Sequence, residues 1–569
     1  MEQQEIRTTP VWDLYQKGRD FLNLKNAYEE TDRHYRFYNG DQWHGAKLGD
    51  VEPVQENIVK PIIKYKRAVI HSNLYAINFS SMNFENRELS AMSDRYCGML
   101  NRYATRVWEQ NKVDSKCREI TRDAAINDEG IFYIDFDKDK KMPLNEVIKK
   151  VDIYYGDETN PDIQSQPYII IRKRMPLSMA RDYAESHGIS AEKLSYIIAD
   201  TDTFDESGDD AKQEVDNQTT LVFKLYKDKD TVKFSSASRY IEIENDVDLE
   251  ISLYPVAHFC WESKEGSARG EGECRHLIPN QIEINKTLMR RLLTAKKQAF
   301  PRQIVDISKV TNPDALNTVG GIIKVNDQTV DDVKKVVGTM QPAQMSPDVK
   351  VIHDELIQNT RDLAGAGDAA TGTAQLNSQT SGRAILAQQS AAQAPISEMR
   401  ENFKTFIEDV ASIWLEYLIA HSKGGVMLEE EMPDQSIQVV RVPQSILKDL
   451  QATVKIDITP KSPFDKFAQE QMLETMLTSG LFSAQRLGEV KAWATALDDD
   501  TTAPKQKILD IIKNMEQDQL RIAQINAEVQ ATKQRAQQFF NSDVNAQAQQ
   551  LLGAEQFIAA QQMAQQQNN

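Results

Sequence analysis

The sequence lacks three common motifs of enzymes. No segment matches the phosphate cradle G-x-x-x-x-G-K-[ST], the nucleophile elbow G-x-S-x-G or the zinc motif H-E-x-x-H. These motifs supply backbone amides for phosphate, an exposed serine, or paired zinc ligands. The eight histidines are scattered, with no evident pairing of a base and a nucleophile. We therefore expect that the protein is not an enzyme. The absence of the phosphate-binding motif argues most directly against an ATPase.

Four residues near the middle of the chain have the types that zinc prefers. They are His258, Cys260, Cys274 and His276. One residue lies between the members of each pair, whereas zinc-binding pairs usually have two to four residues between them. Cys260 also lies in an apolar run, where a buried thiol is ordinary. We expect no metal and no cofactor.

A second group matches part of a calcium-binding loop. Asp135, Asp137, Asp139 and Glu146 occupy its first, third, fifth and twelfth positions. The sixth position needs glycine for a sharp turn, and this chain has Lys140 there. The preceding residues alternate as in a strand, so a solvated turn between two strands is the better interpretation.

Glycines and cations gather near the centre of the chain. Gly270-Glu271-Gly272 lacks the third glycine of a dinucleotide loop, and we interpret it as a flexible lead-in to a helix. The densest basic cluster follows: Arg290, Arg291, Lys296, Lys297 and Arg302. It indicates either a solvated helix face or a belt that faces DNA or a partner subunit.

Composition limits the class of protein. The length of 569 residues allows roughly three or four structural units. The net charge is −18, which argues against a tight grip on DNA because such a grip uses Lys and Arg. Four cysteines predict reduced thiols rather than a disulfide framework. We find no membrane-length apolar run and no secretory core, and we expect assembly in the cytoplasm.

Apolar spacing predicts that the N-terminal part changes from helices to strands. Residues 12–45 are expected to form a helix followed by a turn, which closes on residues 38–43. Further helices are expected over residues 57–75, 89–110 and 114–130. The expected strands cover residues 131–136, 151–155, 168–172, 220–226 and 251–261, with an acidic surface loop at 200–216.

The C-terminal part is predicted to be mainly helical. Helices are expected from near Pro279 to 299, over 347–364 and over 383–420, with strand-like pieces at 303–337 and a Gly-rich loop before residue 383. Strand-like runs follow at 436–442 and 453–459. The Gln-rich and Ala-rich remainder carries a weak heptad pattern.

The order of these parts resembles the portal proteins of tailed bacteriophages across nearly the whole chain. Tyr38–Trp43 (YNGDQW) and Glu56–Ile62 (ENIVKPI) are similar to the opening of many phage portals. Gly270–Gly272 with Leu277–Asn285 (LIPNQIEIN) is similar to the start of the family's first stem helix. The segments similar to its second stem helix, tunnel loop and tunnel helix are Asn359–Gly365 (NTRDLAG), Gly372 and Ser381–Ile385 (SGRAI).

The resemblance implies a fold class and a division into domains. The fold would be mixed α+β and mainly helical, with a wing, stem, clip and helical crown. The implied parts are the N-terminal wing (1–265), stem helix 1 (266–299), clip (300–346), stem helix 2 (347–364), tunnel loop (365–382), long tunnel helix and wing strands (383–462), and a crown with a Gln-rich tail, or a short barrel (463–569).

The resemblance also implies a function. The chain would form a homo-oligomeric ring, dodecameric in the family, at one capsid vertex of the virion, for genome packaging, DNA retention, tail attachment and DNA ejection. Its partners would be the terminase large subunit, a head–tail adaptor, the major capsid and scaffolding proteins, and passing double-stranded DNA, with no membrane. The alternative is another structural virion protein, such as an adaptor or minor capsid protein.

The tunnel loop is the first candidate for contact with DNA. Its polar side chains can make brief phosphate contacts without large binding energy, and an acidic channel would let the duplex slide. The loop residues expected to face DNA are Asp368, Thr371, Thr373, Gln375, Asn377 and Gln379. The basic cluster is the second candidate.

Overall fold

The computed structural model describes most of the chain up to residue 458 and parts of the remainder. The described residues are 7–48, 52–71, 75, 77–81, 87–200, 217–299, 303–312, 314–315, 322–325, 337–340, 344–371, 394–431, 437–451, 454–458, 475, 490, 511–512, 515, 521–535, 537–538, 547, 550, 553, 555–556 and 558. The chain divides into two compact units, Met1–Pro460 and Lys461–Asn569.

The first unit mixes helices and strands, with more of its described residues in helices. Its helices are α1 (Pro10–Leu24), α2 (Ala27–Asn39), α3 (Val59–Ile70), α4 (Arg87–Gln110), α5 (Val113–Ile126), α6 (Leu177–Ser186), α7 (Ala191–Leu194), α8 (Glu273–Ala299), α9 (Asp348–Leu363), α10 (Asp368–Thr371), α12 (Ser397–Ala420) and α13 (Gln444–Gln451). The mixed and mainly helical content predicted from the sequence is thereby confirmed.

The strands form antiparallel sheets. They are β1 (Ile77–Ser81), β2 (Glu129–Asp137), β3 (Met142–Ile148), β4 (Ile153–Tyr155), β5 (Ile169–Pro176), β6 (Gln218–Asp228), β7 (Thr231–Ala237), β8 (Glu242–Asp248), β9 (Val256–Cys260), β10 (Gln303–Val305), β11 (Val337–Thr339), β12 (Val426–Glu431), β13 (Ile437–Val442) and β14 (Val454–Ile458). Their orders are β3-β2-β9, β4-β5-β6-β7-β8, β1-β14, β10-β11 and β12-β13.

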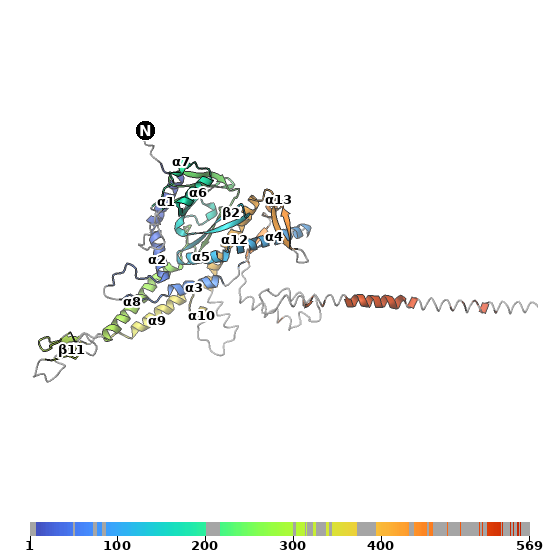
Figure 1. Cartoon of the computed structure of the whole chain (residues 1–569). Coiled ribbons are helices and arrows are strands. Elements are labelled where there is room, and N and C mark those ends of the chain that lie inside the picture. Colours follow the sequence, from blue (N-terminus) through green and yellow to red (C-terminus); the bar gives the residue numbers. More distant parts are fainter. Residues whose placement is uncertain are drawn as a thin grey trace, which may run out of the picture. The chain divides into compact units, whose positions relative to one another are not determined.

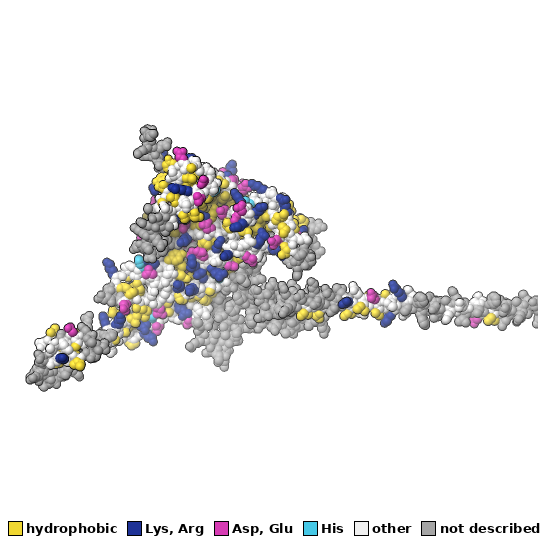
Figure 2. All heavy atoms as spheres, viewed as in Figure 1, with side chains coloured by type: hydrophobic (Ala, Val, Ile, Leu, Met, Phe, Trp, Pro, Cys, Tyr) yellow, Lys and Arg dark blue, Asp and Glu magenta, His cyan; other side chains and the backbone are white. Residues whose placement is uncertain are grey.

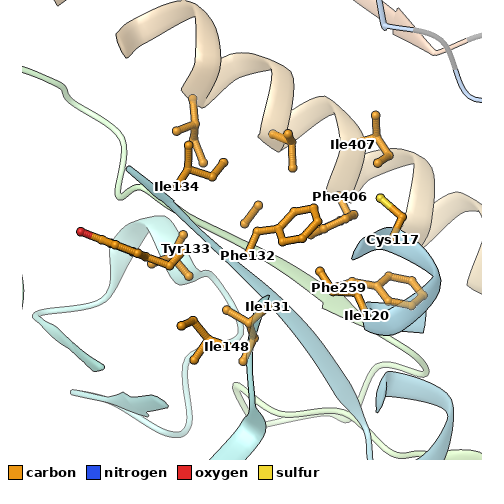
Figure 3. Packing of buried hydrophobic residues seen from close by; sticks show 14 of the residues in the cluster. Cys117, Ile120, Ile131, Phe132, Tyr133, Ile134, Ile148, Phe259, Phe406 and Ile407 are labelled. Carbon is orange, nitrogen blue, oxygen red and sulfur yellow. The ribbon is translucent and has the colours of Figure 1, made fainter. Parts of the chain in front are cut away.

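The main core lies where α12 crosses the β3-β2-β9 sheet (Figure 3). Phe406 of α12 packs 5.3 Å from Phe132 of β2, and Phe403 packs 5.4 Å from Phe259 of β9, measured between ring centroids. These rings are almost completely buried. Because aromatic side chains bury large apolar areas, they make the largest packing contribution at this crossing.

Local backbone chemistry corrects several expected boundaries at the N-terminus. The single helix expected within residues 12–45, before the predicted turn, is two helices, α1 and α2. Thr9 begins α1 by accepting a hydrogen bond from Trp12 N at 3.3 Å. Asn26 separates the two helices with a left-handed φ of 54°, and Gly40 ends α2 with a φ of 101°.

Two more predictions are wrong in extent. The strand expected over residues 251–261 is reduced to β9, because residues 251–255 are not in a strand. The helix expected over 383–420 is not continuous, because Ala394–Ile396 is a 3-10 turn around Pro395 and α12 begins only at Ser397. Residues 381–393 lie outside the described residues.

In the second unit, residues 521–535 are α-helical with exposed side chains, as the predicted C-terminal helix requires. Ile522 and Val529, two members of the heptad pattern, are about half exposed. The helix therefore presents an apolar seam that its own unit leaves uncovered in the described part.

Candidate functional site

Helices α8 and α9 run in opposite directions along each other (Figure 1). Asn280 Nδ2 donates to Thr360 Oγ1 at 3.1 Å, and Arg291 Nη1 lies 3.3 Å from His353 Nδ1. The chain that joins the two helices contains the antiparallel β10–β11 pair. Two segments separated by this insertion therefore form one structural element, which we call the α8–α9 pair.

Two buried amide side chains on α8, Gln281 and Asn285, hold the N-terminal segment in place. Gln281 Oε1 accepts from Ile58 N at 2.9 Å, and its Nε2 donates to Glu56 O at 2.7 Å. Asn285 Oδ1 accepts from Glu56 N at 3.1 Å, and its Nδ2 donates to Gln42 Oε1 at 2.6 Å. This amide clamp satisfies backbone groups that no helix or sheet pairs. It also brings together three segments on which the sequence resemblance was based.

A buried ion pair fixes the first turn of α8. Lys66 Nζ of α3 lies 2.7 Å from Glu273 Oε2, and both side chains are buried. Trp261 Nε1 donates to the same oxygen at 3.3 Å. A carboxylate in the first helical turn also interacts favourably with the helix dipole. The start of α8 is thus tied to α3 and to the end of the β3-β2-β9 sheet.

The Gly270–Gly272 segment packs tightly against the backbone near Cys260 and Asn127. The prediction that this segment is a flexible lead-in is therefore wrong. A Cβ at Gly270 would overlap Cys260 Sγ, and one at Gly272 would overlap the carbonyl oxygen of Asn127. Glu271 N donates to Glu262 O at 2.9 Å. Glycine is required here because two backbone segments approach closely.

A buried ion cluster lies beside this segment. Arg269 Nη1 donates to Glu129 Oε1 at 2.5 Å, and its Nε donates to Glu158 Oε2 at 2.8 Å. Glu129 Oε2 lies 2.8 Å from His258 Nε2 and accepts from Tyr155 OH at 3.2 Å. Burial opposes ionisation of Glu129, but Arg269 and His258 outweigh it and lower its pKa to about 2. The carboxylate is therefore charged and structural.

The C-terminal end of α9 is closed by a Schellman motif. Gly365 N donates to Asp362 O at 3.0 Å, and Ala366 N donates to Arg361 O at 2.8 Å. Gly365 has a φ of 68°, which a residue with a side chain rarely adopts. The motif fixes the direction in which the chain leaves the α8–α9 pair.

The beginning of the predicted tunnel loop is anchored to this end. Asp368 Oδ1 lies 3.1 Å from Arg361 Nη1, and Thr371 Oγ1 donates to Gly367 O at 3.1 Å. Tyr65 OH of α3 donates to Ala370 O at 2.9 Å. The other predicted loop residues, Thr373, Gln375, Asn377 and Gln379, lie outside the described residues.

The residues of the basic cluster have different surroundings and do not form one site. Lys and Arg side chains are scattered over the face of the molecule in view, among acidic ones (Figure 2). Arg291 contacts His353, and Lys296 Nζ lies 2.9 Å from Glu52 Oε2. Arg290 and Lys297 are exposed on α8. Arg302 lies outside the described residues. Two cations of the cluster, Arg291 and Lys296, therefore have a side-chain partner, and Arg290 and Lys297 form no ion pair with another described residue.

The four residues considered for zinc do not converge. His258 contacts Glu129, and His276 Nε2 lies 3.4 Å from Glu271 Oε2. Cys260 Sγ donates to Glu262 O, and Cys274 Sγ donates to His34 O. Among the described residues, no three His, Cys, Asp or Glu side chains gather closely enough to hold a metal ion.

The calcium-like segment is a β-hairpin turn, which confirms the alternative preferred from the sequence. Strands β2 and β3 pair from Ile131↔Ile148 to Asp137↔Met142. Asp137 Oδ1 accepts from Asp139 N and Lys140 N, each at 3.0 Å. The aspartate therefore stabilises the turn itself.

Sequence reasoning missed the buried charges that position α8. Glu129 and Arg269 are 140 residues apart, and Lys66 and Glu273 are 207 residues apart. Nothing in the local sequence indicates that these charges pair with each other. The amide clamp was visible only as part of a family-like segment.

The comparison with protein families identifies the family of this chain. The family model described as phage P22-like portal protein matches residues 234–569. This range includes α8, α9 and α12. None of the curated proteins compared with the chain matches it. Among the described residues, no helix combines the length and apolar character needed to cross a bilayer.

Proposed function

Because the chain belongs to the P22-like phage portal protein family, we propose that its copies form a ring at one capsid vertex, through which double-stranded DNA is packaged and released. The family match, which spans more than half of the chain, is the observation that carries this proposal. A closed ring requires one heterologous interface repeated around an axis. The family is structural, and we assign the chain no enzymatic step.

We further propose how the parts divide the work. Residues 1–265 and 383–462 form the wing, the α8–α9 pair forms the stem, residues 300–346 form the clip, and residues 463–569 form the crown. The clip meets the terminase large subunit during packaging and the head–tail adaptor afterwards. The other partners are the major capsid and scaffolding proteins, and the proposed subunit number is twelve.

Electron microscopy of the purified full-length chain tests the ring. The expected result is isolated rings with an axial channel. Monomers or filaments without a channel, at all protein and salt concentrations tried, would contradict the proposal. A parallel ATPase assay is expected to give no turnover above buffer, because the packaging energy comes from the terminase.

The tunnel loop is proposed to contact DNA through short-lived polar contacts. Its fixed beginning, where Asp368 pairs with Arg361 and Thr371 bonds to Gly367, would hold the loop at the end of the stem. Deleting residues 372–381 should leave rings intact and reduce packaged or retained DNA. A variant with the same length of Gly and Ser is the control for loop length. Normal packaging by the deletion variant would refute the loop's role.

A further inference from the structure

A group of cations lies on α3 and the adjoining part of α5. Lys60, Lys64 and Arg67 are spaced four and then three residues apart, which places them along one side of α3. Arg118 of α5 adjoins this side, because Arg67 Nη2 donates to its main-chain oxygen at 2.6 Å. Lys64 and Arg118 are exposed, and the other two are partly buried. We call these four residues the α3 basic patch.

The charges of this patch are not neutralised by nearby carboxylates. No ion pair among the described residues includes a member of the patch. Arg67 and Arg118 each donate to a main-chain oxygen, which carries no net charge. The adjacent Arg122 instead pairs with two carboxylates of α5, Glu119 at 3.8 Å and Asp123 at 3.0 Å. These two acids are therefore already used by an arginine outside the patch.

The partly buried His71, which follows the last residue of α3, responds to the positive charge. Burial is the largest cause that lowers the pKa of His71 to about 4, and Arg67 and Arg118 lower it further. Asp114 acts in the opposite direction, with a smaller effect than either arginine. The electrostatic potential at this end of α3 is therefore positive, although the whole chain has a net charge of −18.

Helix α3 also lies beside the chain that leads into the proposed tunnel loop and out of it. On the way in, Tyr65 OH of α3 donates to Ala370 O of α10 at 2.9 Å (Figure 1). On the way out, the 3-10 turn before α12 contacts α3. A Cβ added to Gly365 would lie 3.4 Å from Pro395 Cβ, so the incoming and outgoing chains are close together.

The exposed face of α3 connects the start of the loop to the patch. The exposed residues of the helix are Pro61, Lys64 and Ala68. Successive residues of an α-helix are about 100° apart around its axis, so these three lie between the side of Tyr65 and the basic side. The exposed face of α3 therefore leads from the contact with Ala370 to the patch.

We propose that the α3 basic patch contacts the phosphate backbone of double-stranded DNA, as a second contact beside the tunnel loop. This inference rests on the proposed ring and its DNA channel. Lys60 and Arg67 are about 10 Å apart along the helix axis, which matches roughly three phosphates of one strand. DNA fits the patch because its charge is opposite and because the loop proposed to reach DNA starts beside the same helix. Four cations in an acidic chain suit brief contacts with a sliding duplex.

Lysine labelling of full-length rings tests the contact directly. The rings are briefly acetylated with and without a duplex of about 30 base pairs, at about 0.05 M salt, where phosphate contacts are strong. Mass spectrometry then identifies the labelled lysines. The duplex should slow the labelling of Lys64 at least about threefold, because bound phosphates would cover its amino group. Lys17 of α1 and Lys193 of α7 are exposed internal controls and should be labelled equally in both samples.

Charge reversal measures how much the patch contributes to binding. Lys64→Glu with Arg118→Glu should raise the dissociation constant for the same duplex at least about tenfold at about 0.05 M salt. It should also reduce the salt dependence of binding, by about one unit or more in the slope of log K against log salt. Fluorescence anisotropy of a labelled duplex measures both, and electron microscopy with circular dichroism checks the rings and the fold.

Two matched variants accompany the reversal. Lys17→Glu with Lys193→Glu makes the same change in net charge away from α3 and should change the dissociation constant by less than about threefold. Lys64→Arg keeps the charge and should bind like the unaltered chain. If the reversal at α3 prevents ring formation, the labelling of the unaltered rings decides the question.

The outcomes separate this contact from the proposed function. If the unaltered chain forms no rings, the proposed function fails and this inference fails with it. If rings form but bind no duplex, or the duplex protects Lys64 no more than Lys17, only the contact at α3 is overturned. Lys64 that is already unreactive in rings without DNA would assign the patch to a neighbouring copy and would also overturn the contact with DNA.

Discussion

The core around α12 and the outer half of the α8–α9 pair show two ways of using a helix. In the core, α12 buries Phe403 and Phe406 completely against a sheet of the same chain. In the pair, Leu292 and Ile352 remain about half exposed. The first region excludes its apolar side chains from solvent, whereas the second leaves aliphatic side chains partly in contact with it.

The largest expected effect comes from removing one aromatic ring of the core. Phe406→Ala should lower the free energy of unfolding by about 4 kcal/mol, because it leaves a cavity between α12 and the sheet. Urea unfolding followed by tryptophan fluorescence measures the loss, since Trp261 and Trp414 are buried in the same core. The matched change Leu292→Ala should cost less than about 1 kcal/mol in the single chain. Equal losses would erase the proposed contrast between the two regions.

Breaking the buried ion cluster should have the next largest effect. Arg269→Met leaves the Glu129 carboxylate buried without its main partner and should cost about 3 kcal/mol. Adding Glu129→Gln should recover much of this loss in the same unfolding experiment. Arg290→Met, on the exposed face of α8, is the control and should change the free energy of unfolding little. A loss that the second substitution does not relieve would mean that shape, not charge, matters at Arg269.

The amide clamp lies at the border of the two regions and should show an intermediate effect. Asn285→Ala removes the partners of Glu56 N and Gln42 and should cost about 2 kcal/mol. Limited proteolysis should also cut the segment between α2 and α3 faster. Asn359→Ala, an exposed amide on α9, should change neither result. Unchanged proteolysis of the Asn285 variant would show that α8 does not hold this segment.

The smallest expected effect concerns pH. Burial lowers the pKa of His71 to about 4, because its ring packs against Phe403 and between helices. Between about pH 4 and pH 6.5, the unfolded chain therefore binds a proton at His71 that the folded chain does not bind. The contribution of His71 to the free energy of unfolding is therefore fully present above about pH 6.5 and is lost as pH falls toward 4. Burial raises the pKa of Asp409 to about 6. Protonation of Asp409 therefore raises the free energy of unfolding as pH falls, which opposes the effect of His71.

Comparing variants isolates the histidine from that opposing group. Between pH 7.5 and pH 5, His71→Asn should lose about 2 kcal/mol less of its free energy of unfolding than the unaltered chain does. The exposed His276→Asn should behave like the unaltered chain. An identical pH dependence for all three proteins would show that folding does not change the proton binding of His71.

Sequence patterns predicted the elements whose apolar residues repeat locally. The limits of α4 and α9 were predicted to within about two residues because each has a continuous apolar stripe. Strand β8, with the sequence EIENDVD, was missed because its polar residues carry no alternation and it depends on pairing with β7. The interruption before α12 was missed although Pro395 marks it.

The candidate site was less predictable for the same reason. The sequence located the α8–α9 pair and the basic cluster, which are local features. It did not reveal the amide clamp or the Glu129–Arg269 pair, because their partners are brought together only by the fold. It also did not separate Arg291, which contacts His353, from its exposed neighbour Arg290. That difference depends on the position of a second helix.

The pairing of β1 with β14 has a consequence for how the protein is made. Ile77 pairs with Ile458, so an early strand waits for one that is synthesised near the end of the first unit. At about 5–20 residues per second, the ribosome needs roughly 20–75 s to proceed from Ile77 to Ile458. During this time β1 lacks its pairing strand, and the strand edge is available to other chains. Translation speed and chaperone supply should therefore influence the yield of soluble protein more strongly than they would for a chain folded from consecutive segments.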